Sequence, residues 1–196
     1  MKEKFYAVMD EKNKLIYKTW NDVLEILPKL SKPKYKSFST KEEAEAFLSG
    51  VEYKDDHTEP TAYIDGSYDS DTEAYSFGGC FILDGNIYQF KKNYPKDEYS
   101  SMRNVAGEIK GAAYVMQYAI NHNINKIYIY FDYIGIEKWF TGEWKAKSPI
   151  ALEYVKYCNT IKDKLEVIFV KVKSHTNNYY NDLADRLAKE ALGINS

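Results

Sequence analysis

The sequence has few cysteines, almost no net charge and no long apolar run, and each absence excludes a class of protein. Its two cysteines, Cys80 and Cys158, are too few for a disulfide framework or a four-cysteine zinc site. We therefore expect both thiols to be small buried apolar groups in a cytoplasmic, reducing environment. No run approaches the roughly 20 apolar residues of a membrane span. The first residues contain no apolar stretch, so we expect neither a secretory signal nor a membrane partner.

Charge is nearly balanced, with 27 lysines and arginines, 29 aspartates and glutamates and a formal net charge of −2. This balance excludes a wholly basic, histone-like nucleic-acid binder but allows a local basic patch. Residues 26–41 carry five lysines and no acid, together with Tyr35 and Phe38. A lysine run alone is more often a solvated surface. Lysines interleaved with aromatic rings are, however, also what phosphates and sugar faces require.

The pattern of apolar residues predicts two folded parts joined by a linker. A hydrophobic content of 44% excludes wholesale disorder. Periodicity lapses in the polar, acidic segment 49–60, which we interpret as the linker. The part before it, 1–48, is expected to form a small αβ module with strands over 4–9, 14–18 and 34–39 and helices over 19–27 and 40–48. Thr40 and Glu43 have the spacing of a capping box at the start of the second helix.

The part after the linker, 61–196, predicts a larger αβ domain. We expect strands over 61–67, 77–84, 87–93, 126–132 and 165–171, and helices over 104–121, 134–141, 149–161 and 178–192. This order (βββαβααβα) is typical of a mixed five-stranded sheet with helices on its faces. Gly85-Asn86, between the second and third strands, predicts a tight hairpin turn.

Four carboxylates stand where acids are uncommon. Asp65 and Asp132 end apolar strands, Glu108 lies between small residues one turn into a helix, and Asp185 lies on the inner face of the last helix. Ligands and chemistry gather at the strand ends of αβ sheets. Four converging carboxylates would repel each other and raise each other's pKa unless cations were bound. Two Mg²⁺ ions would remove that cost, since Mg²⁺ prefers oxygen ligands. For any one of these acids, a turn or cap role stays an alternative.

Four short segments and one histidine occur in a specific order. The segments are Tyr63–Ser67 (YIDGS), Arg103–Glu108 (RNVAGE), Ile129–Asp132 (IYFD) and Asn181–Asp185 (NDLAD). His175 precedes Asp185 by ten residues. In content, order and spacing, residues 60–192 resemble type 1 ribonuclease H, whose mobile histidine stands at this distance. The resemblance implies an RNase H-like five-stranded fold.

Residues 4–48 separately resemble the small hybrid-binding, viroplasmin-like domain that precedes many such enzymes. The matching pieces are Phe5–Val8, Ile16–Trp20, Tyr35–Phe38 and Glu42–Leu48. The resemblance implies that three aromatic side chains pack on DNA-strand sugars and that Lys36 contacts a phosphate; the three are Trp20, Tyr35 and Phe38. As an alternative, at least one of these rings belongs to the module's core.

The resemblance implies an endonuclease that hydrolyses the RNA strand of RNA/DNA hybrids, leaving 3′-hydroxyl and 5′-phosphate ends. The four carboxylates would hold two Mg²⁺ ions, for which Mn²⁺ can substitute. His175 would shuttle a proton or help product leave. Gly66 would approach the RNA sugar, and Ser67 and Asn104 would bond 2′-hydroxyls. Their alternative roles are a turn glycine, a strand-end serine and a helix N-cap asparagine.

The sequence departs from the family's pattern in its potential substrate contacts. Tyr133 and Ile134 replace a polar pair that follows the third carboxylate in many relatives, and segment 141–149 is short where some carry a long basic protrusion. Segment 9–14 of the first module includes two acids in place of a glycine- and arginine-bearing stretch. Two further functions stay open: a DNA-cutting nuclease of the same fold, and a non-catalytic protein that binds hybrid or double-stranded RNA. We expect a monomer.

Overall fold

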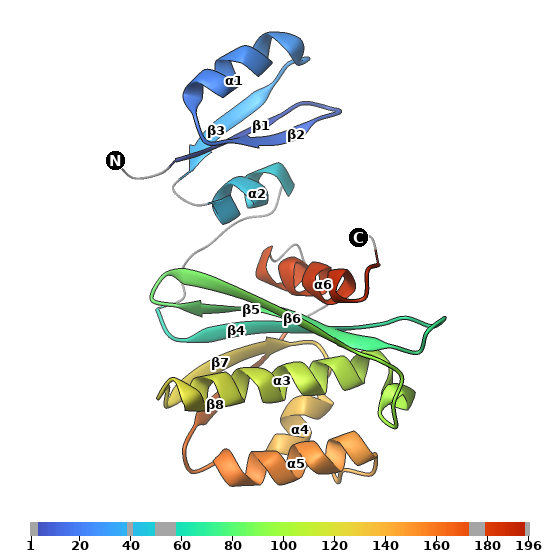
Figure 1. Ribbon diagram of the computed structural model, residues 1–196. Helices are drawn as coiled ribbons and strands as arrows, with labels where there is room; N and C mark the ends of the chain where they lie inside the picture. The colour runs from blue at the N-terminus through green and yellow to red at the C-terminus, as the bar shows by residue number, and fades with distance from the viewer. Residues whose placement is uncertain (1–3, 39–40, 50–57, 173–178, 195–196) are drawn as a thin grey trace. The chain divides into compact units, whose positions relative to one another are not determined.

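The computed structural model describes residues 4–38, 41–49, 58–172 and 179–194 of the 196-residue chain, in two compact units (Figure 1). The predicted linker lies largely outside the described residues. The division into 1–48, 49–60 and 61–196 therefore stays a prediction. Among the described residues, no helix is long and apolar enough to cross a membrane.

The N-terminal unit is a three-stranded antiparallel sheet with one helix on each face (Figure 1). Its central strand, β1 (Phe5–Met9), pairs with β2 (Lys14–Tyr17) and β3 (Lys34–Phe38). Helix α1 (Trp20–Ile26) is capped by Thr19, whose hydroxyl accepts a hydrogen bond from the Asp22 amide. It continues into the 3-10 turn η1 (Leu27–Lys29). Helix α2 (Lys41–Ser49) contributes Ala44 and Leu48 to a small core. The predicted capping box includes Thr40, which lies outside the described residues.

The larger unit contains the mixed five-stranded sheet that the sequence predicts. Its strand order is β6-β5-β4-β7-β8, antiparallel from β4 to β6 and parallel from β4 to β8. The strands are β4 (Thr61–Tyr68), β5 (Tyr75–Leu83), β6 (Asn86–Tyr94), β7 (Lys126–Phe131) and β8 (Glu166–Lys171). The helical segments are η2 (Ser100–Met102), α3 (Asn104–Asn121), α4 (Gly135–Thr141), α5 (Pro149–Ile161) and α6 (Tyr179–Ala191).

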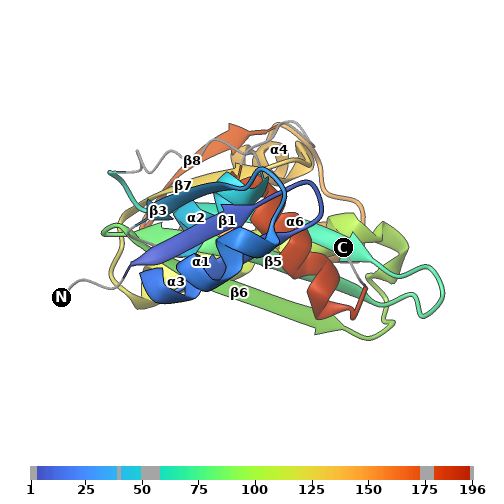
Figure 2. The ribbon, with the colours of Figure 1, turned by 90° about the horizontal axis from the view of Figure 1, so that it is seen from above.

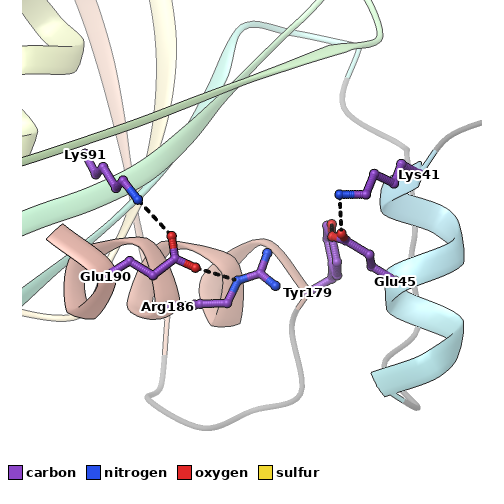
Figure 3. A network of polar contacts seen from close by, with 6 residues as sticks. All are labelled: Lys41, Glu45, Lys91, Tyr179, Arg186 and Glu190. Carbon is purple, nitrogen blue, oxygen red and sulfur yellow. Dashed lines mark hydrogen bonds and ion pairs between the residues drawn. The ribbon is translucent and has the colours of Figure 1, made fainter. Parts of the chain in front are cut away.

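Helices cover both faces of this sheet. Helices α3, α4 and α5 lie on one face and α6 on the other (Figure 1). Figure 2 shows α6 passing over β5, where the Ser76 hydroxyl donates to the Ala188 carbonyl at 2.6 Å. Near its end, Glu190 of α6 forms an ion pair with Lys91 of β6 at 2.9 Å and a longer one with Arg186 at 3.9 Å (Figure 3). The Ser76 and Lys91 contacts join α6 to the sheet, whereas the Arg186 pair lies within the helix.

The structure corrects one sequence prediction and confirms another. The hairpin turn between β5 and β6 is centred on Asp84-Gly85, one residue before the predicted Gly85-Asn86, because Asn86 already pairs with Leu83. Asp84 and Gly85 have φ angles of +50° and +72°, the positive values that a type I′ turn needs at both central residues. Cys80 and Cys158 are unpaired and fully buried, as predicted.

Candidate active site

Two of the predicted carboxylates follow from the pairing of parallel strands. Tyr63 of β4 lies opposite Tyr130 of β7. Two residues further along each strand, Asp65 and Asp132 therefore reach the same level at the carboxyl edge of the sheet. Asp65 lies within β4, whereas Asp132 comes directly after β7. Parallel strand ends of this kind are the usual position of a site in an αβ sheet.

Glu108 comes to the same edge from the first turns of α3. Its side chain is only 3% exposed. One carboxylate oxygen, Oε2, accepts a hydrogen bond from the backbone amide of Tyr133 at 3.0 Å. This bond joins α3 to the segment that follows β7, so Glu108 and Asp132 are neighbours. The sequence analysis placed Glu108 between small residues near the start of a helix, but it predicted neither the burial of this side chain nor the role of Tyr133 as its donor.

Asp185 belongs to α6, on the opposite face of the sheet from α3. The ring of Tyr180, one turn earlier in α6, stacks on Tyr63 of β4 at 5.2 Å, which places this helix over β4. Burial is the main cause that raises the pKa of Asp65, and the charge of Asp185 adds to it, so Asp185 lies within electrostatic reach of Asp65. Asp65, Glu108, Asp132 and Asp185 thus converge from four elements, and we call them the carboxylate cluster.

Burial and mutual repulsion shift the protonation of two members of the cluster. Burial is the main cause that raises the pKa of Asp65 to about 7, and the charges of Asp185 and Asp132 add to it. A hydrogen bond from the Gly66 amide to Asp65 Oδ1 at 2.7 Å acts in the opposite direction. Burial likewise raises the pKa of Glu108 to about 8, with Asp65 as the next cause. Near neutral pH, these two groups therefore carry protons for much of the time unless a cation offsets their charge.

The donor chemistry of the cluster fits a divalent cation. It offers only carboxylate oxygens, the ligands that Mg²⁺ prefers, and two of them are costly to ionise without a counter-charge. With the side chains as they stand, no group of three or more His, Cys, Asp or Glu among the described residues could hold one ion. Binding a cation at this edge would therefore require side-chain rearrangement within the cluster.

The structure also shows the surroundings of the predicted RNA contacts. Gly66 is not a turn glycine, because it lies inside β4 with α3 packed on it. Ser67 follows it in the same strand. Asn104 is the first residue of α3, and Arg103, with a φ of +52°, occupies the N-cap position, so the alternative of Asn104 as N-cap is wrong. His175 lies outside the described residues.

The candidate contacts of the N-terminal unit lie on two faces of its sheet. Trp20 and Tyr35 are 40% and 52% exposed, and their rings lie 5.7 Å apart. Phe38 instead is partly buried and packs against Phe47 at 5.5 Å beside the small core, so it is the one of the three aromatics that contacts the module's core. Lys36 shares the face of Phe38, with its Nζ 5.4 Å from that ring. Successive residues of a strand point to opposite faces, so Tyr35 and Lys36 lie on different faces and these four side chains do not form one patch.

Two lysines that the sequence analysis did not single out contact the cluster. Lys189 lies 2.8 Å from Asp185, and Lys171 lies 3.5 Å from Asp132. The first could have been found from its spacing of four residues along a helix. The second depends on the register between β7 and β8, which the sequence does not reveal.

Comparison with protein families and curated proteins supports the resemblance. The family described as RNase H matches residues 57–193, and the family described as Ribonuclease H1 N-terminal domain matches residues 4–48. Two curated relatives, each called Ribonuclease H and each from a strain of Clostridium botulinum, are 37% identical to this chain over 60 residues. That stretch is 29% of this chain and 40% of each relative, so the chain spans less than half of the relatives' length.

Solved structures share the fold of the larger unit. RNase H1 from the halophilic archaeon Halobacterium salinarum superposes with a TM-score of 0.57 at 21% identity, over 69% of this chain and 98% of that one. The RNase H domain of Rv2228c from Mycobacterium tuberculosis gives 0.54 at 17% identity, over 67% and 98%. LC11-RNase H1, solved in complex with an RNA/DNA hybrid, gives 0.53 at 15% identity, over 68% and 99%.

The fold, the two matched segments and their order agree with one another. The mixed five-stranded sheet is the one that these solved structures share, and a three-stranded module precedes it. Since the RNase H match alone covers more than half of the sequence, the chain belongs to the ribonuclease H family and begins with that family's RNase H1 N-terminal domain.

Proposed function

We propose that the chain is an endoribonuclease that hydrolyses the RNA strand of RNA/DNA hybrids and leaves 3′-hydroxyl and 5′-phosphate ends. The observation that carries the proposal is the carboxylate cluster itself. Its members come from β4, α3, the end of β7 and α6, and burial, with mutual repulsion added to it, raises the pKa values of Asp65 and Glu108. Such an arrangement costs stability in the absence of cations, so a folding role alone does not account for it.

In this proposal the four carboxylates hold two Mg²⁺ ions, or Mn²⁺ in their place. Bound ions of this kind supply an activated water and offset charge on the departing 3′ oxygen. The chain's own residues orient the ligands: the Tyr133 amide holds Glu108, and the Gly66 amide holds Asp65. His175, the predicted mobile histidine, moves a proton to the leaving oxygen or assists product release.

Selection of RNA over DNA rests on groups at the same edge of the sheet. Ser67 lies two residues beyond Asp65, and Asn104 lies one turn before Glu108 in α3, so both border the cluster. Their side chains suit hydrogen bonds to 2′-hydroxyls in the minor groove of a hybrid. Gly66, between Asp65 and Ser67, would let the RNA sugar come close to the backbone.

The N-terminal unit contributes affinity for the duplex. Its exposed Trp20 and Tyr35 offer an aromatic surface for sugars, and its exposed lysines offer phosphate contacts. Lys36 and Phe38 lie on the other face, so we expect them to contribute less than the Trp20–Tyr35 pair. We propose that the enzyme works as a monomer in the cytoplasm, the compartment that two unpaired buried cysteines favour.

A cleavage assay on matched RNA/DNA, RNA/RNA and DNA/DNA duplexes, with and without Mg²⁺, tests the proposal. We expect Mg²⁺-dependent cuts in the RNA strand of the hybrid alone, with 3′-hydroxyl and 5′-phosphate ends. Cleavage of the all-DNA duplex would instead indicate a DNA-cutting nuclease. Hybrid binding without metal-dependent cleavage would indicate a non-catalytic binding protein.

A further inference from the structure

Two lysines reach the carboxylate cluster from different elements. Lys189 Nζ lies 2.8 Å from Asp185 Oδ2, which is a close, charge-assisted contact. Lys171 Nζ lies 3.5 Å from Asp132 Oδ1. All four side chains are 36–46% exposed, so water and ions reach both pairs.

The backbone fixes both lysines in place. Lys189 and Asp185 are four residues apart in α6, the spacing at which helical side chains meet. Lys171 is the last residue of β8 and lies opposite Phe131, the residue before Asp132. The first pair is therefore set by a helix and the second by the register of parallel strands.

The lysines occupy oxygens that a divalent cation would need. Asp132 and Asp185 are the two more exposed members of the cluster, whereas Asp65 and Glu108 are more deeply buried. Each ammonium thus offsets charge on one exposed member of the cluster.

We propose that Lys171 and Lys189 are built-in counter-ions that compete with the divalent cation for Asp132 and Asp185. They hold the cation-free cluster together, and the cation must displace them, so they set the cation concentration that the protein requires. The inference rests on the proposed function for its cation, because it takes the cluster to be the Mg²⁺ site.

The expected effect is moderate, because half-exposed ion pairs are individually weak and water screens the repulsion between an ammonium and a bound cation. Replacing Lys189 by Met should tighten cation binding by roughly 3- to 10-fold. Lys171→Met should have a smaller effect, since its pair is longer. The double variant should bind tighter than either single variant.

The experiment is calorimetric titration of the full chain with Mn²⁺ alone, repeated as a thermal-shift titration with Mg²⁺. Lys189→Arg keeps the charge and should bind within about twofold of the wild type, which separates charge from packing. Lys138→Met is the matched control, since Lys138 has an ion pair of similar length, 2.7 Å, to Glu143 outside the cluster. Its cation affinity should stay at the wild-type value.

A second measurement needs no cation. In EDTA, the double variant should melt at a lower temperature than the wild type, because its carboxylates have lost both counter-ions. The proposal is overturned if folded Lys189→Met binds Mn²⁺ no more tightly than the wild type. It is also overturned if Lys189→Arg and Lys138→Met tighten Mn²⁺ binding as much as Lys189→Met does. The hybrid-cleavage assay on the wild type decides the proposed function separately, so the failure of either idea is distinguishable.

Discussion

Gly66 of β4 lies directly against the backbone of Glu108 in α3. A methyl group added at Gly66 would come within 2.8 Å of the Glu108 amide nitrogen and 2.1 Å of the Asn104 carbonyl oxygen. Gly107, the residue before Glu108 in α3, approaches β5 just as closely. A methyl group added at Gly107 would lie 1.8 Å from the Ser76 carbonyl oxygen. Two glycines thus bring the start of α3 onto the sheet and place Glu108 beside Asp65.

We expect Gly66→Ala to destabilise the protein by about 3 kcal/mol or more, because backbone atoms of α3 cannot move aside as a flexible side chain could. Urea unfolding followed by circular dichroism measures the change. Gly142→Asn is the control, because a side chain added at Gly142 would meet open space. The φ of Gly142 is +82°, a value that Asn tolerates. It should lose at most about 1 kcal/mol. Equal losses in both variants would contradict the packing argument.

Asp132→Asn should nearly abolish Mg²⁺-dependent cleavage of a hybrid while leaving the fold intact. The amide keeps the shape of the side chain, but the charge of a proposed metal ligand is lost. Initial rates at saturating Mg²⁺, with circular dichroism spectra of both proteins, provide the measurement. Near-wild-type turnover would show that Asp132 is not a ligand.

Asp65→Asn should stabilise the cation-free protein at pH 8 but not at pH 4. The pKa of Asp65 rises from an ordinary 3.8 to about 7 in the folded protein. Between these values the folded state binds more protons than the unfolded state, so the free energy of unfolding falls as pH rises through this window. Asn has no proton to lose and avoids that loss while still accepting from the Gly66 amide. Melting in EDTA should show a gain at pH 8 of roughly 2–8 °C.

A control at the exposed carboxylate Asp69 completes this test. Hydrogen bonds from Thr72 and Asp71 lower the pKa of Asp69, so Asp69→Asn should show no stabilisation at pH 8. A loss of stability at pH 8 in Asp65→Asn would mean that burial of the Asp65 charge carries no penalty. Adding Mg²⁺ should narrow the difference between the wild type and Asp65→Asn, because the cation stabilises the ionised cluster.

The sequence predicted the elements of the fold better than the contacts between them. Apolar periodicity located α3 and α5 to the residue, and strand ends pointed to Asp65 and Asp132. Their positions in predicted helices singled out Glu108 and Asp185 as well, but only the family resemblance joined all four acids in one site, because a helix position alone does not say which sheet edge it meets. Alternation along β3 could have assigned Tyr35 and Lys36 to different faces from the sequence alone, since neighbours on a strand point opposite ways.

Other features depend on distances that no local pattern encodes. The pairing of Lys171 with Asp132 follows from the parallel register of β7 and β8, in which Phe131 lies opposite Lys171. The need for glycine at position 66 follows from the approach of α3 rather than from any turn. Both features arise only when distant parts of the chain pack together.

His175→Ala should slow hybrid cleavage by roughly 10- to 10²-fold, at or below the usual contribution of positioned proton transfer. The motivation is its ten-residue distance from Asp185 in the sequence. Calorimetric Mn²⁺ binding should be little changed. His122→Ala is the control, since that histidine stacks on Tyr118 at the end of α3, and it should keep wild-type turnover. Lost cation affinity in His175→Ala would make His175 a ligand.

A shortened chain that begins at Glu59 should fold and still cleave a hybrid. The five-stranded sheet begins at Thr61, the whole carboxylate cluster remains, and two solved RNase H1 structures match 69% and 68% of this chain over nearly their whole length. Its affinity should fall, most clearly on long hybrids, because exposed Trp20 and Tyr35 and the lysines of 29–41 are absent.

The salt dependence of binding distinguishes loss of phosphate contacts from loss of stacking. Each duplex phosphate contact removed should flatten the slope of log affinity against log salt by about 0.9. Loss of aromatic contacts alone would lower affinity without changing that slope. A full-length Trp20→Ala, Tyr35→Ala variant supplies this second case, since it keeps every lysine.

The measurement is KM and its salt dependence for the three proteins on one long hybrid. If the full-length and shortened chains give the same curves, the N-terminal unit does not bind substrate in this protein, and its resemblance to the hybrid-binding family is one of fold only.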